Sequence, residues 1–286
     1  MLLTVFTPTY NRANTITRLF ESLKRQSFKD FEWLIVDDGS TDDTAKIVKT
    51  FDSDGQFDIR YIRKENGGKH TAYNIGLEEA KGVLFFNVDS DDWLHQDSLL
   101  QISTLSEQAL AKADSAGIIA LKSFADGSII GNKFIHDGIF HTFRDLELLG
   151  QGGERSIVFR TAIASKFRFP LVSGEKFMPE GIVYDKYHDF SFLISNRSLT
   201  ICEYQENGLS SNPKALMLRN PGCYKLYYRN RIDMAASIKE RLGYILRYNF
   251  FAHTYKGTDV EDYRGAHSLL VRSMKALNCI VSRSYK

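Results

Sequence analysis

Short apolar runs alternate with amphipathic stretches over the first hundred residues. The apolar, β-prone runs predict buried strands at residues 2–7, 31–36, 59–63 and 83–88. Between them, apolar residues recur at helical spacing and predict helices at residues 14–26, 42–51 and 70–80. Because strands and helices alternate with short links, we expect βα units and a mostly parallel sheet. Such a sheet binds ligands at the carboxyl ends of its strands.

The pattern continues beyond residue 96 and becomes less regular after residue 130. It predicts a helix at 97–113, a strand at 116–124 followed by a hairpin around ADGS, a strand at 156–160, a loop at 167–179 and a helix at 180–194. From Pro213 onward the chain reads as helical and is rich in Tyr and Arg. We therefore expect a domain boundary near residue 212.

The composition is that of an ordinary soluble globular protein, with 43% hydrophobic and 25% charged residues in a chain of 286. Three scattered cysteines, Cys202, Cys223 and Cys279, argue against a disulfide scaffold and fit a reducing compartment. The start of the chain does not resemble a secretory signal, and no apolar stretch approaches the roughly 20 residues of a spanning helix. We expect a cytoplasmic protein, or one attached to the inner face of the cell membrane.

Charge is distributed unevenly along the chain. Residues 213–286 contain 14 Lys and Arg but 5 Asp and Glu, whereas the rest contains 23 basic and 30 acidic residues. Apolar residues between Ile232 and Leu246 form a helical stripe interspersed with basic residues. One interpretation is a basic amphipathic helix on an anionic membrane surface, and the other is packing of the stripe on the preceding domain, residues 1–212.

The stretch LFFNVDSDDWL, residues 84–94, ends an apolar strand in three carboxylates: Asp89, Asp91 and Asp92. Aspartates this close repel one another unless a cation compensates them. A hard divalent ion such as Mg²⁺ or Mn²⁺ binds through one or two carboxylates together with substrate phosphates. The alternative is a helix N-terminus, which also favours acidic residues.

A second acidic turn, VDDGSTD, follows the strand at 31–36. Gly39 suits a tight turn, and Asp37 and Asp38 could accept hydrogen bonds from a base or a ribose. The alternative is a strand-to-helix turn capped by Ser40 or Thr41.

The stretch NGGKHTAYN, residues 66–74, combines two glycines, the start of a helix and Lys69. Exposed backbone N–H groups beside a lysine suit a phosphate, although the stretch is neither a Walker A loop nor a Rossmann fingerprint. An Asn-Gly turn without a ligand is the alternative.

The four motifs TPTYNR, VDDGSTD, NGGKHTAYNIGL and DSDDWL, in this order and at these spacings, resemble the family 2 glycosyltransferases. The resemblance is close over residues 1–100 and loose to about 210. It implies a GT-A fold, an α/β architecture in which helices flank a mixed, mostly parallel nucleotide-binding sheet. The expected domains are 1–212, with a donor-nucleotide half at 1–100 and an acceptor half at 101–212, and a basic helical region at 213–286.

The resemblance also implies a nucleotide-diphosphate sugar donor, usually a UDP-sugar, and Mg²⁺ or Mn²⁺ as the cofactor. By position, the expected donor-binding residues are Thr7, Pro8, Tyr10 and Arg12 at the uridine end, Asp37 and Asp38 at uracil or ribose, Lys69 near uracil or the diphosphate, and Asp89 with Ser90 at the ribose. Asp91 is the expected metal ligand, and Asp92 is the less certain member of the cluster.

An inverting transferase needs a carboxylate that removes the proton of the acceptor hydroxyl. Family members carry an Asp in an ED pair before a helix, and here Glu180 of PEGIVYDKY occupies the Asp position. The change from ED to PE departs from the family pattern, so Glu175 and Asp185 remain competitors. Glu180 also reads as an ordinary first-turn helix acid. Residues 204–212 are either a loop over the donor or a linker.

The sequence thus predicts a metal-dependent, inverting glycosyltransferase of surface polysaccharide synthesis, with a saccharide or lipid-diphosphate-linked acceptor. One alternative is a nucleotidyltransferase, which would need a glycine- and Arg/Lys-rich loop after the first strand that TPTYNR lacks. The other is a non-catalytic nucleotide-sugar-binding protein. We expect no nucleic-acid partner, because no reader motif is visible.

Overall fold

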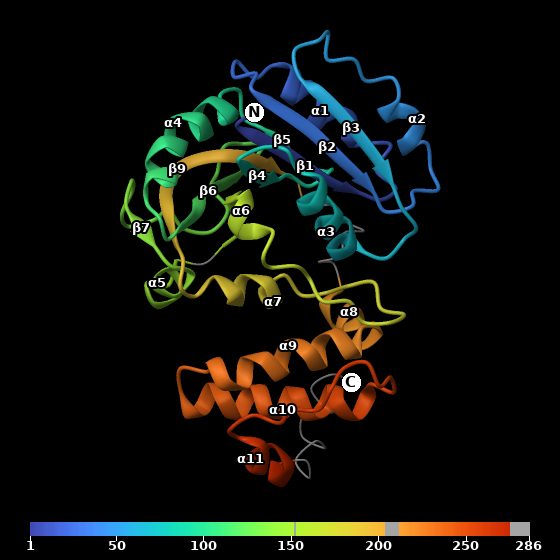
Figure 1. Cartoon of the computed structure of the whole chain (residues 1–286), viewed down its shortest axis with the longest axis vertical. Helices are drawn as coiled ribbons and strands as arrows, with labels where there is room; N and C mark the ends of the chain where they lie inside the picture. Colours follow the sequence, from blue (N-terminus) through green and yellow to red (C-terminus); the bar gives the residue numbers. More distant parts are fainter. Residues whose placement is uncertain (152, 204–211, 275–286) are drawn as a thin grey trace. The chain divides into compact units, whose positions relative to one another are not determined.

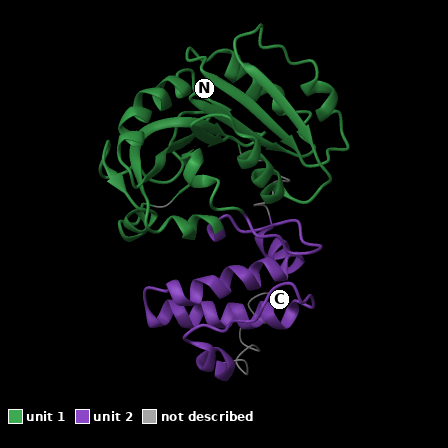
Figure 2. Cartoon of the chain, viewed as in Figure 1, with its two compact units in different colours: residues 1–168, 183–204 green, residues 169–182, 205–286 purple. Residues whose placement is uncertain are grey.

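The computed structural model describes residues 1–151, 153–203 and 212–274 (Figure 1). The chain divides into two compact units: residues 1–168 with 183–204, and residues 169–182 with 205–286 (Figure 2). Cys202 and Cys223 are buried free thiols. Cys279 and the predicted loop or linker at 204–211 lie outside the described residues.

The described residues of the first unit build one nine-stranded sheet in the order β3-β2-β1-β4-β8-β6-β9-β5, with β7 paired to β9. The strands are β1 (Leu3–Thr9), β2 (Phe31–Asp37), β3 (Asp58–Arg63), β4 (Leu84–Asn87), β5 (Trp93–Leu94), β6 (Ser115–Phe124), β7 (Phe140–His141), β8 (Arg155–Arg160) and β9 (Ser191–Cys202). The helices between them are α1 (Ile16–Lys24), α2 (Thr44–Val48), α3 (Lys69–Glu79), α4 (Ser98–Ala111), α5 (Phe143–Leu148) and α6 (Thr161–Ala164).

The sheet is mixed, and its first half is parallel as the βα alternation predicts. β3, β2, β1 and β4 run in the same direction, whereas β8 is antiparallel to β4 and β6. β6 and β9 are parallel to each other. Thr9 pairs with Asp37, so β1 and β2 end at the same level. The loops that follow β1, β2 and β4 therefore meet at one edge of the sheet.

Helices cover both faces of this sheet. On one face, side chains of α1 and α4 share a core with inward residues of the sheet such as Val5 and Trp33, which are fully buried, and Phe20 of α1 stacks on Trp33. On the opposite face, Tyr73 of α3 makes edge contacts with Phe6 and Phe85. The sheet core is therefore dry on both sides, which fixes the strand ends that carry the polar motifs.

Strand β1 continues through Pro8, where the apolar pattern predicts its end. Consecutive residues of a strand form their ladder hydrogen bonds on alternate sides, and Thr9 bonds toward β2 by accepting from Asp38 N–H at 2.8 Å. Pro8 faces the β4 side, beyond the last paired residue of β4, Asn87. The missing N–H of proline is therefore tolerated at this position.

The helix predicted at 180–194 is wrong for most of its length. The structure has α7 (Gly181–Tyr184) and a 3₁₀ turn η1 (Asp185–Tyr187), and β9 begins at Ser191. The helical spacing of apolar residues correctly predicts the first two turns, where Ile182, Val183 and Tyr187 are buried. The following run FLISNRSLTIC pairs with β6, β7 and β5, so strand pairing overrides the helical reading.

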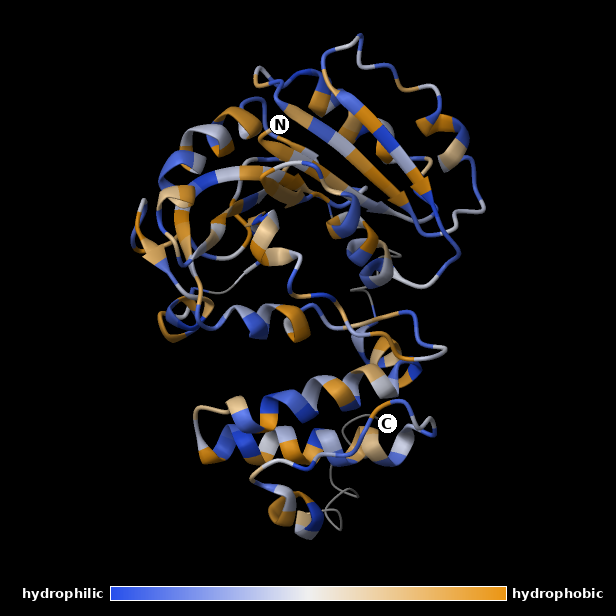
Figure 3. Ribbon diagram, in the orientation of Figure 1, coloured by the Kyte–Doolittle hydropathy of each residue, from blue (hydrophilic) through white to orange (hydrophobic). Residues whose placement is uncertain are grey.

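The described part of the second unit is helical, with α8 (Pro213–Arg219), α9 (Pro221–Met234), α10 (Ile238–Thr254) and α11 (Ser268–Ser273). Hydrophobic and hydrophilic residues alternate along α9 and α10 in Figure 3, as expected of amphipathic helices. Ile232 of α9 and Ile245 of α10 are fully buried in one aromatic-rich core. None of the helices in the described residues combines the length and hydrophobicity of a bilayer-crossing segment.

The apolar stripe between Ile232 and Leu246 belongs to two helices rather than one. The oxygen of the Ser237 hydroxyl accepts a hydrogen bond from Glu240 N–H at 3.1 Å, and the Glu240 carboxylate reaches back to Ala236 N–H at 2.8 Å. The sequence SIKE, residues 237–240, is a pattern typical of a helix N-terminus. The continuous helical spacing of the apolar residues predicts one helix across it. Ile232 and Ile245 of the stripe pack inside their own unit, whereas Ile238 is 73% exposed.

We predict that Gly117→Ala strongly destabilises the first unit. Gly117 has φ +141° at a bulge of β6, and an added Cβ would lie 1.9 Å from the carbonyl oxygen of Val158 on β8. Backbone strain and overpacking together should cost about 3 kcal/mol of unfolding free energy or more. Gly127→Ala is the matched control, since Gly127 also has positive φ but open space around it. It should cost about 1 kcal/mol. Equal losses in chemical denaturation would contradict this reading of β6.

Candidate functional site

The segments after β1 and β2 are joined by hydrogen bonds at the carboxyl edge of the sheet. Asn11, with φ 52°, donates its backbone N–H to Ser40 Oγ at 2.9 Å, and its side-chain oxygen accepts from Thr41 N–H at 2.8 Å. The N–H of Arg12 donates to Thr44 Oγ1 at 2.9 Å. Asparagine tolerates the left-handed conformation better than most residues, which suits it to this corner. The segments TPTYNR and DDGSTD therefore meet at the carboxyl edge of the sheet, which is called the rim below.

The acidic turn, residues 89–92, joins the same rim through ion pairs. Each of its three aspartates contacts a basic side chain from another element: Asp89 with Lys69 at 2.9 Å, Asp91 with Arg12 at 3.3 Å, and Asp92 with Lys122 at 3.0 Å. The mutual repulsion of the carboxylates is thus offset by three cations of the protein itself. The ion pairs also bring the ends of β1 and β4 and the start of α3 together.

Asp89 is held as a carboxylate. Burial by itself would raise the pKa of Asp89, but the ammonium groups of Lys69 and Lys122 outweigh burial and lower that pKa to about 2. The side-chain N–H₂ of Asn87 also donates to Asp89 at 3.3 Å. About a third of the Asp89 and Lys69 side chains is exposed, so a ligand can reach this pair.

Asp92 differs from its neighbours because it is enclosed. Its side chain is 8% exposed, and it accepts hydrogen bonds from Lys122 Nζ at 3.0 Å and Cys202 Sγ at 3.2 Å. Burial raises the pKa of Asp92, although Lys122 opposes the shift. Breaking such a buried pair is costly, so Asp92 and Lys122 anchor the turn rather than meet a ligand.

Asp91, like Asp89, is placed to exchange its partner. Its side chain is 22% exposed and that of Arg12 is 33% exposed, so the ion pair lies partly in solvent. The backbone of Asp91 is held by Arg18. The Arg18 guanidinium donates a hydrogen bond to the carbonyl oxygen of Asp91 at 2.8 Å and stacks on the Trp93 ring at 3.7 Å from the ring centroid. A rigid backbone with an accessible carboxylate suits a cation-binding residue.

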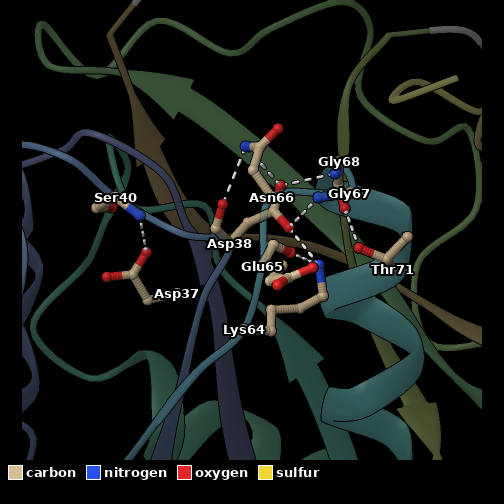
Figure 4. Close-up of polar contacts among 9 residues, drawn as sticks. All are labelled: Asp37, Asp38, Ser40, Lys64, Glu65, Asn66, Gly67, Gly68 and Thr71. Atoms are coloured by element: carbon tan, nitrogen blue, oxygen red, sulfur yellow. Dashed lines mark hydrogen bonds and ion pairs between the residues drawn. The ribbon is translucent and has the colours of Figure 1, made fainter. Parts of the chain in front are cut away.

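The second acidic turn is hydrogen-bonded to the glycine loop, residues 66–68 (Figure 4). Four groups donate to the nearly buried carboxylate of Asp38: Lys64 Nζ at 2.6 Å, the Asn66 amide at 3.2 Å, Gly67 N–H at 2.8 Å and Gly68 N–H at 2.7 Å. Gly39, with φ +80°, permits this approach, since an added Cβ would lie 2.9 Å from Asn66 N.

This geometry gives the glycine loop a specific task. The N–H groups of Gly67 and Gly68, expected to cradle a phosphate, point at Asp38, and α3 begins directly after them with Lys69. Asp38 therefore positions Lys69 toward Asp89. The contact of Asp38 with uracil or ribose stays a prediction. In that contact, the Asp38 oxygens would accept hydrogen bonds from the ligand while they also accept those of the four donors.

Several predicted donor-binding residues lie in the framework beneath the rim. Thr7 is fully buried and accepts a hydrogen bond from Trp33 Nε1 at 3.0 Å. Asp37 is also fully buried and accepts from Ser40 N–H at 2.7 Å and from the Tyr61 hydroxyl. Ser90 is 5% exposed within the acidic turn. These side chains shape the site, and direct contact with a ligand remains a prediction for each.

Other side chains face the rim with unused polar or aromatic surface. Tyr10 is 45% exposed directly after β1. Two atoms, Thr9 Oγ1 and Asn87 Oδ1, are buried at the carboxyl ends of β1 and β4 with no hydrogen-bond partner among the described residues. Buried polar atoms normally have partners, so these two oxygens are candidates for binding a ligand.

The three candidate bases have different environments. Both carboxylate oxygens of Glu175 accept backbone N–H bonds, from Gly222 and Cys223 at 2.7 Å each, so this residue has a structural task in the second unit. Glu180 is exposed and also belongs to the second unit, one residue before α7. Asp185 begins the 3₁₀ turn of the first unit.

In the described ranges, no group of three or more His, Cys, Asp or Glu side chains is arranged to hold a metal ion. The acidic turn fits the other mode of binding, in which Mg²⁺ or Mn²⁺ uses one or two carboxylates and completes its shell with phosphate oxygens and water. Asp91, with its rigid backbone and partly exposed carboxylate, is the residue that fits this role.

Sequence reasoning missed four side chains that organise the site: Arg18, Lys64, Asn87 and Lys122. Asn87 is at the last position of a strand before the acidic turn, a placement that the letters show. The other three come from a helix, a loop and a distant strand. No local spacing marks them, because only the folded sheet brings them to the aspartates.

Residues 4–114 match the family described as Glycosyl transferase family 2. Two similar proteins are glycosyltransferase GlyA of Streptococcus pneumoniae, 41% identical over 95 residues, and poly(ribitol-phosphate) β-N-acetylglucosaminyltransferase TarS of Staphylococcus aureus, 36% identical over 101 residues. These matches cover 33% and 35% of this chain. They cover 14% of GlyA and 18% of TarS, so the chain spans less than a fifth of either relative.

Solved structures extend the likeness over most of the chain at the level of fold. S. aureus TarS 1–349 in complex with UDP-GlcNAc superposes with a TM-score of 0.65 and 22% identity, covering 89% of this chain and 72% of that one. The mannosyltransferase PcManGT of Pyrobaculum calidifontis, in complex with GDP-Man and Mn²⁺, gives a TM-score of 0.55 and 16% identity, covering 97% and 84%. Residues 4–114 of this chain therefore resemble the family 2 glycosyltransferases, and the mixed sheet with its flanking helices has the GT-A fold of these solved structures.

Proposed function

We propose that the chain transfers a sugar, with inversion, from a nucleotide-diphosphate donor to a saccharide or lipid-diphosphate-linked saccharide acceptor. The observation that carries this proposal is the single rim where the segments after β1, β2 and β4 meet, within the residues that match the family. A UDP-sugar is the favoured donor, because the TarS structure with similar fold is a complex with UDP-GlcNAc. Ligand crevices of parallel sheets lie at this edge.

The residues of the rim suit the parts of a nucleotide diphosphate. The exposed ring of Tyr10 offers a stacking surface for the base, and Thr9 and Asn87 offer unused oxygens to ribose hydroxyls. Arg12 and Lys69 are partly exposed cations beside the acidic turn and can bind diphosphate oxygens.

A divalent cation, Mg²⁺ or Mn²⁺, would be held by Asp91. When bound, it would stabilise the charge that develops on the leaving diphosphate. Without the cation, the Arg12 guanidinium forms an ion pair with the Asp91 carboxylate. The cation and Arg12 would therefore compete for this carboxylate until the diphosphate of a bound nucleotide gives Arg12 another anionic partner. Glu180 would remove the proton of the acceptor hydroxyl as that oxygen attacks the anomeric carbon.

The setting proposed for this activity is surface polysaccharide synthesis on the cytoplasmic side of a membrane. Support for a membrane contact is limited to the basic composition of residues 213–286. Within the apolar stripe, Ile232 and Ile245 are buried in the second unit, whereas Ile238 is 73% exposed.

Asp91→Ala should reduce kcat/KM for sugar transfer by about 10²-fold or more, the scale of losing one electrostatic contact to the transition state. Asp43→Ala is the control, since it removes an exposed aspartate whose partner is a surface lysine. Donor-dependent release of UDP measures the effect. Normal turnover by the Asp91 variant in the presence of a chelator would refute this assignment.

Arg12→Gln should strengthen the binding of Mn²⁺ in the absence of nucleotide by several-fold, because it removes the cation that competes for Asp91. An exposed ion pair is worth at most about 1 kcal/mol, which sets this scale. Electron paramagnetic resonance of free Mn²⁺ measures the affinity without any turnover. Arg25→Gln removes the same charge from an exposed position at the end of α1 and should leave the affinity near wild type. Equal affinities in wild type and both variants would contradict competition.

Glu180→Gln should lower kcat by about 10²- to 10⁴-fold, the usual contribution of a general base, while the donor dissociation constant stays unchanged. Asp185→Asn is the matched comparison, because it neutralises one of the two competing carboxylates. Calorimetric titration with the UDP-sugar and a transfer assay separate binding from chemistry. A wild-type rate for Glu180→Gln would move the base elsewhere.

A further inference from the structure

The segment Phe169–Ile182 leaves the first unit and returns to it. Its neighbours along the chain, Arg168 and Val183, belong to the first unit, whereas the segment itself belongs to the helical second unit (Figure 2). No helix or strand is present between Phe169 and Glu180. A stretch without its own secondary structure must be held by other contacts, and those contacts show what it serves.

The first contact is made by Glu175 at the start of α9. Its two carboxylate oxygens accept the N–H groups of Gly222 and Cys223, each at 2.7 Å. Pro221 begins the helix and has no N–H, so these are the first donors that the helix presents. A carboxylate at a helix N-terminus forms charge-assisted bonds and also favours the helix dipole.

The second contact is made by Asn220, the residue between α8 and α9. Its side-chain oxygen accepts the N–H groups of Lys176 and Phe177 at 3.1 Å each, and its N–H₂ donates to Leu216 at 2.8 Å. Asn220 is 6% exposed, so these bonds are sheltered from water. The aromatic ring of Phe177 adds a stacked contact with Tyr224 of α9, with centroids 6.0 Å apart.

Further contacts lie on both sides of this pair. The N–H of Ser173 donates to Asp259 at 2.7 Å. A Cβ added to Gly222 would lie 2.8 Å from the Val172 side chain, and one added to Gly181 would lie 3.1 Å from the Tyr227 ring. Contacts between this segment and the helical part of the second unit therefore extend from Val172 to Gly181, the residue directly after Glu180.

We propose that the helical second unit is a positioning element of the transferase: Glu175 and Asn220 fix the backbone at residues 175–177 and thereby orient Glu180. The inference rests on the proposed function, in which Glu180 is the base. It gives the basic C-terminal region a part in the chemistry without any contact with the donor. It also explains why Glu175, although close in sequence, is a positioning residue and not the base.

The test uses the full chain with Glu175→Ala, Asn220→Ala and the conservative Glu175→Gln, which keeps one acceptor oxygen. Glu261→Ala removes an exposed acid of the same unit and serves as the control. Hydrogen exchange of the amides of residues 176, 177, 222 and 223 measures the stability of the hydrogen bonds made by Glu175 and Asn220. Steady-state kinetics at saturating donor measure kcat. We expect the two alanine variants to exchange faster at these amides and to lose at least tenfold in kcat. Donor KM should stay within twofold of wild type, and Glu175→Gln should be intermediate.

Wild-type kcat in a variant whose amides exchange faster would overturn the proposal. A parallel loss of kcat and donor affinity would also overturn it, since that result indicates general destabilisation rather than positioning of one group. The proposed function has its own readout in the same series. If the wild-type chain binds no nucleotide sugar, the proposed function fails, whereas normal transfer with insensitive variants defeats the positioning role alone.

Discussion

The site depends on the separate neutralisation of three neighbouring aspartates. Asp89, Asp91 and Asp92 would repel one another, and each is paired with a cation from another element of the fold: Lys69 of α3, Arg12 after β1 and Lys122 of β6. Burial separates the pairs into two kinds. The Asp92 pair is enclosed and anchors the turn, whereas the other two are partly exposed and can exchange partners with a ligand. One cluster of like charges thus contains a structural anchor and, in the proposed function, the groups that bind the donor and its cation.

The rest of the rim supports these pairs. Asp38 holds the glycine loop that starts α3, so it sets where Lys69 begins. Asn11 ties the segment before Arg12 to the second acidic turn. The dry, two-sided sheet core keeps the strand ends in place, so the proposed exchange of the Arg12–Asp91 ion pair would need little movement of the strands. Such preorganisation is what electrostatic stabilisation of a leaving group requires.

The sequence predicts the parallel half of the sheet and the edge where the motifs meet, because buried strands and their polar ends are local patterns. It does not predict the cations, since Lys122 and Arg18 reach the acidic turn only through pairing of distant strands and helices. The apolar letters after Tyr187 continue a helical spacing that strand pairing with β6 overrides. The roles of Glu175 and Asn220 depend on a chain path that leaves one unit and returns, which no local pattern records.

The most direct measurement is a crystal structure of the full chain with Mn²⁺ and UDP. We expect the ion to contact Asp91, the diphosphate to lie beside it, and the Arg12–Asp91 ion pair to be replaced while the Asp92–Lys122 pair persists. UDP and Mn²⁺ bound away from the acidic turn, with all three ion pairs intact, would contradict it.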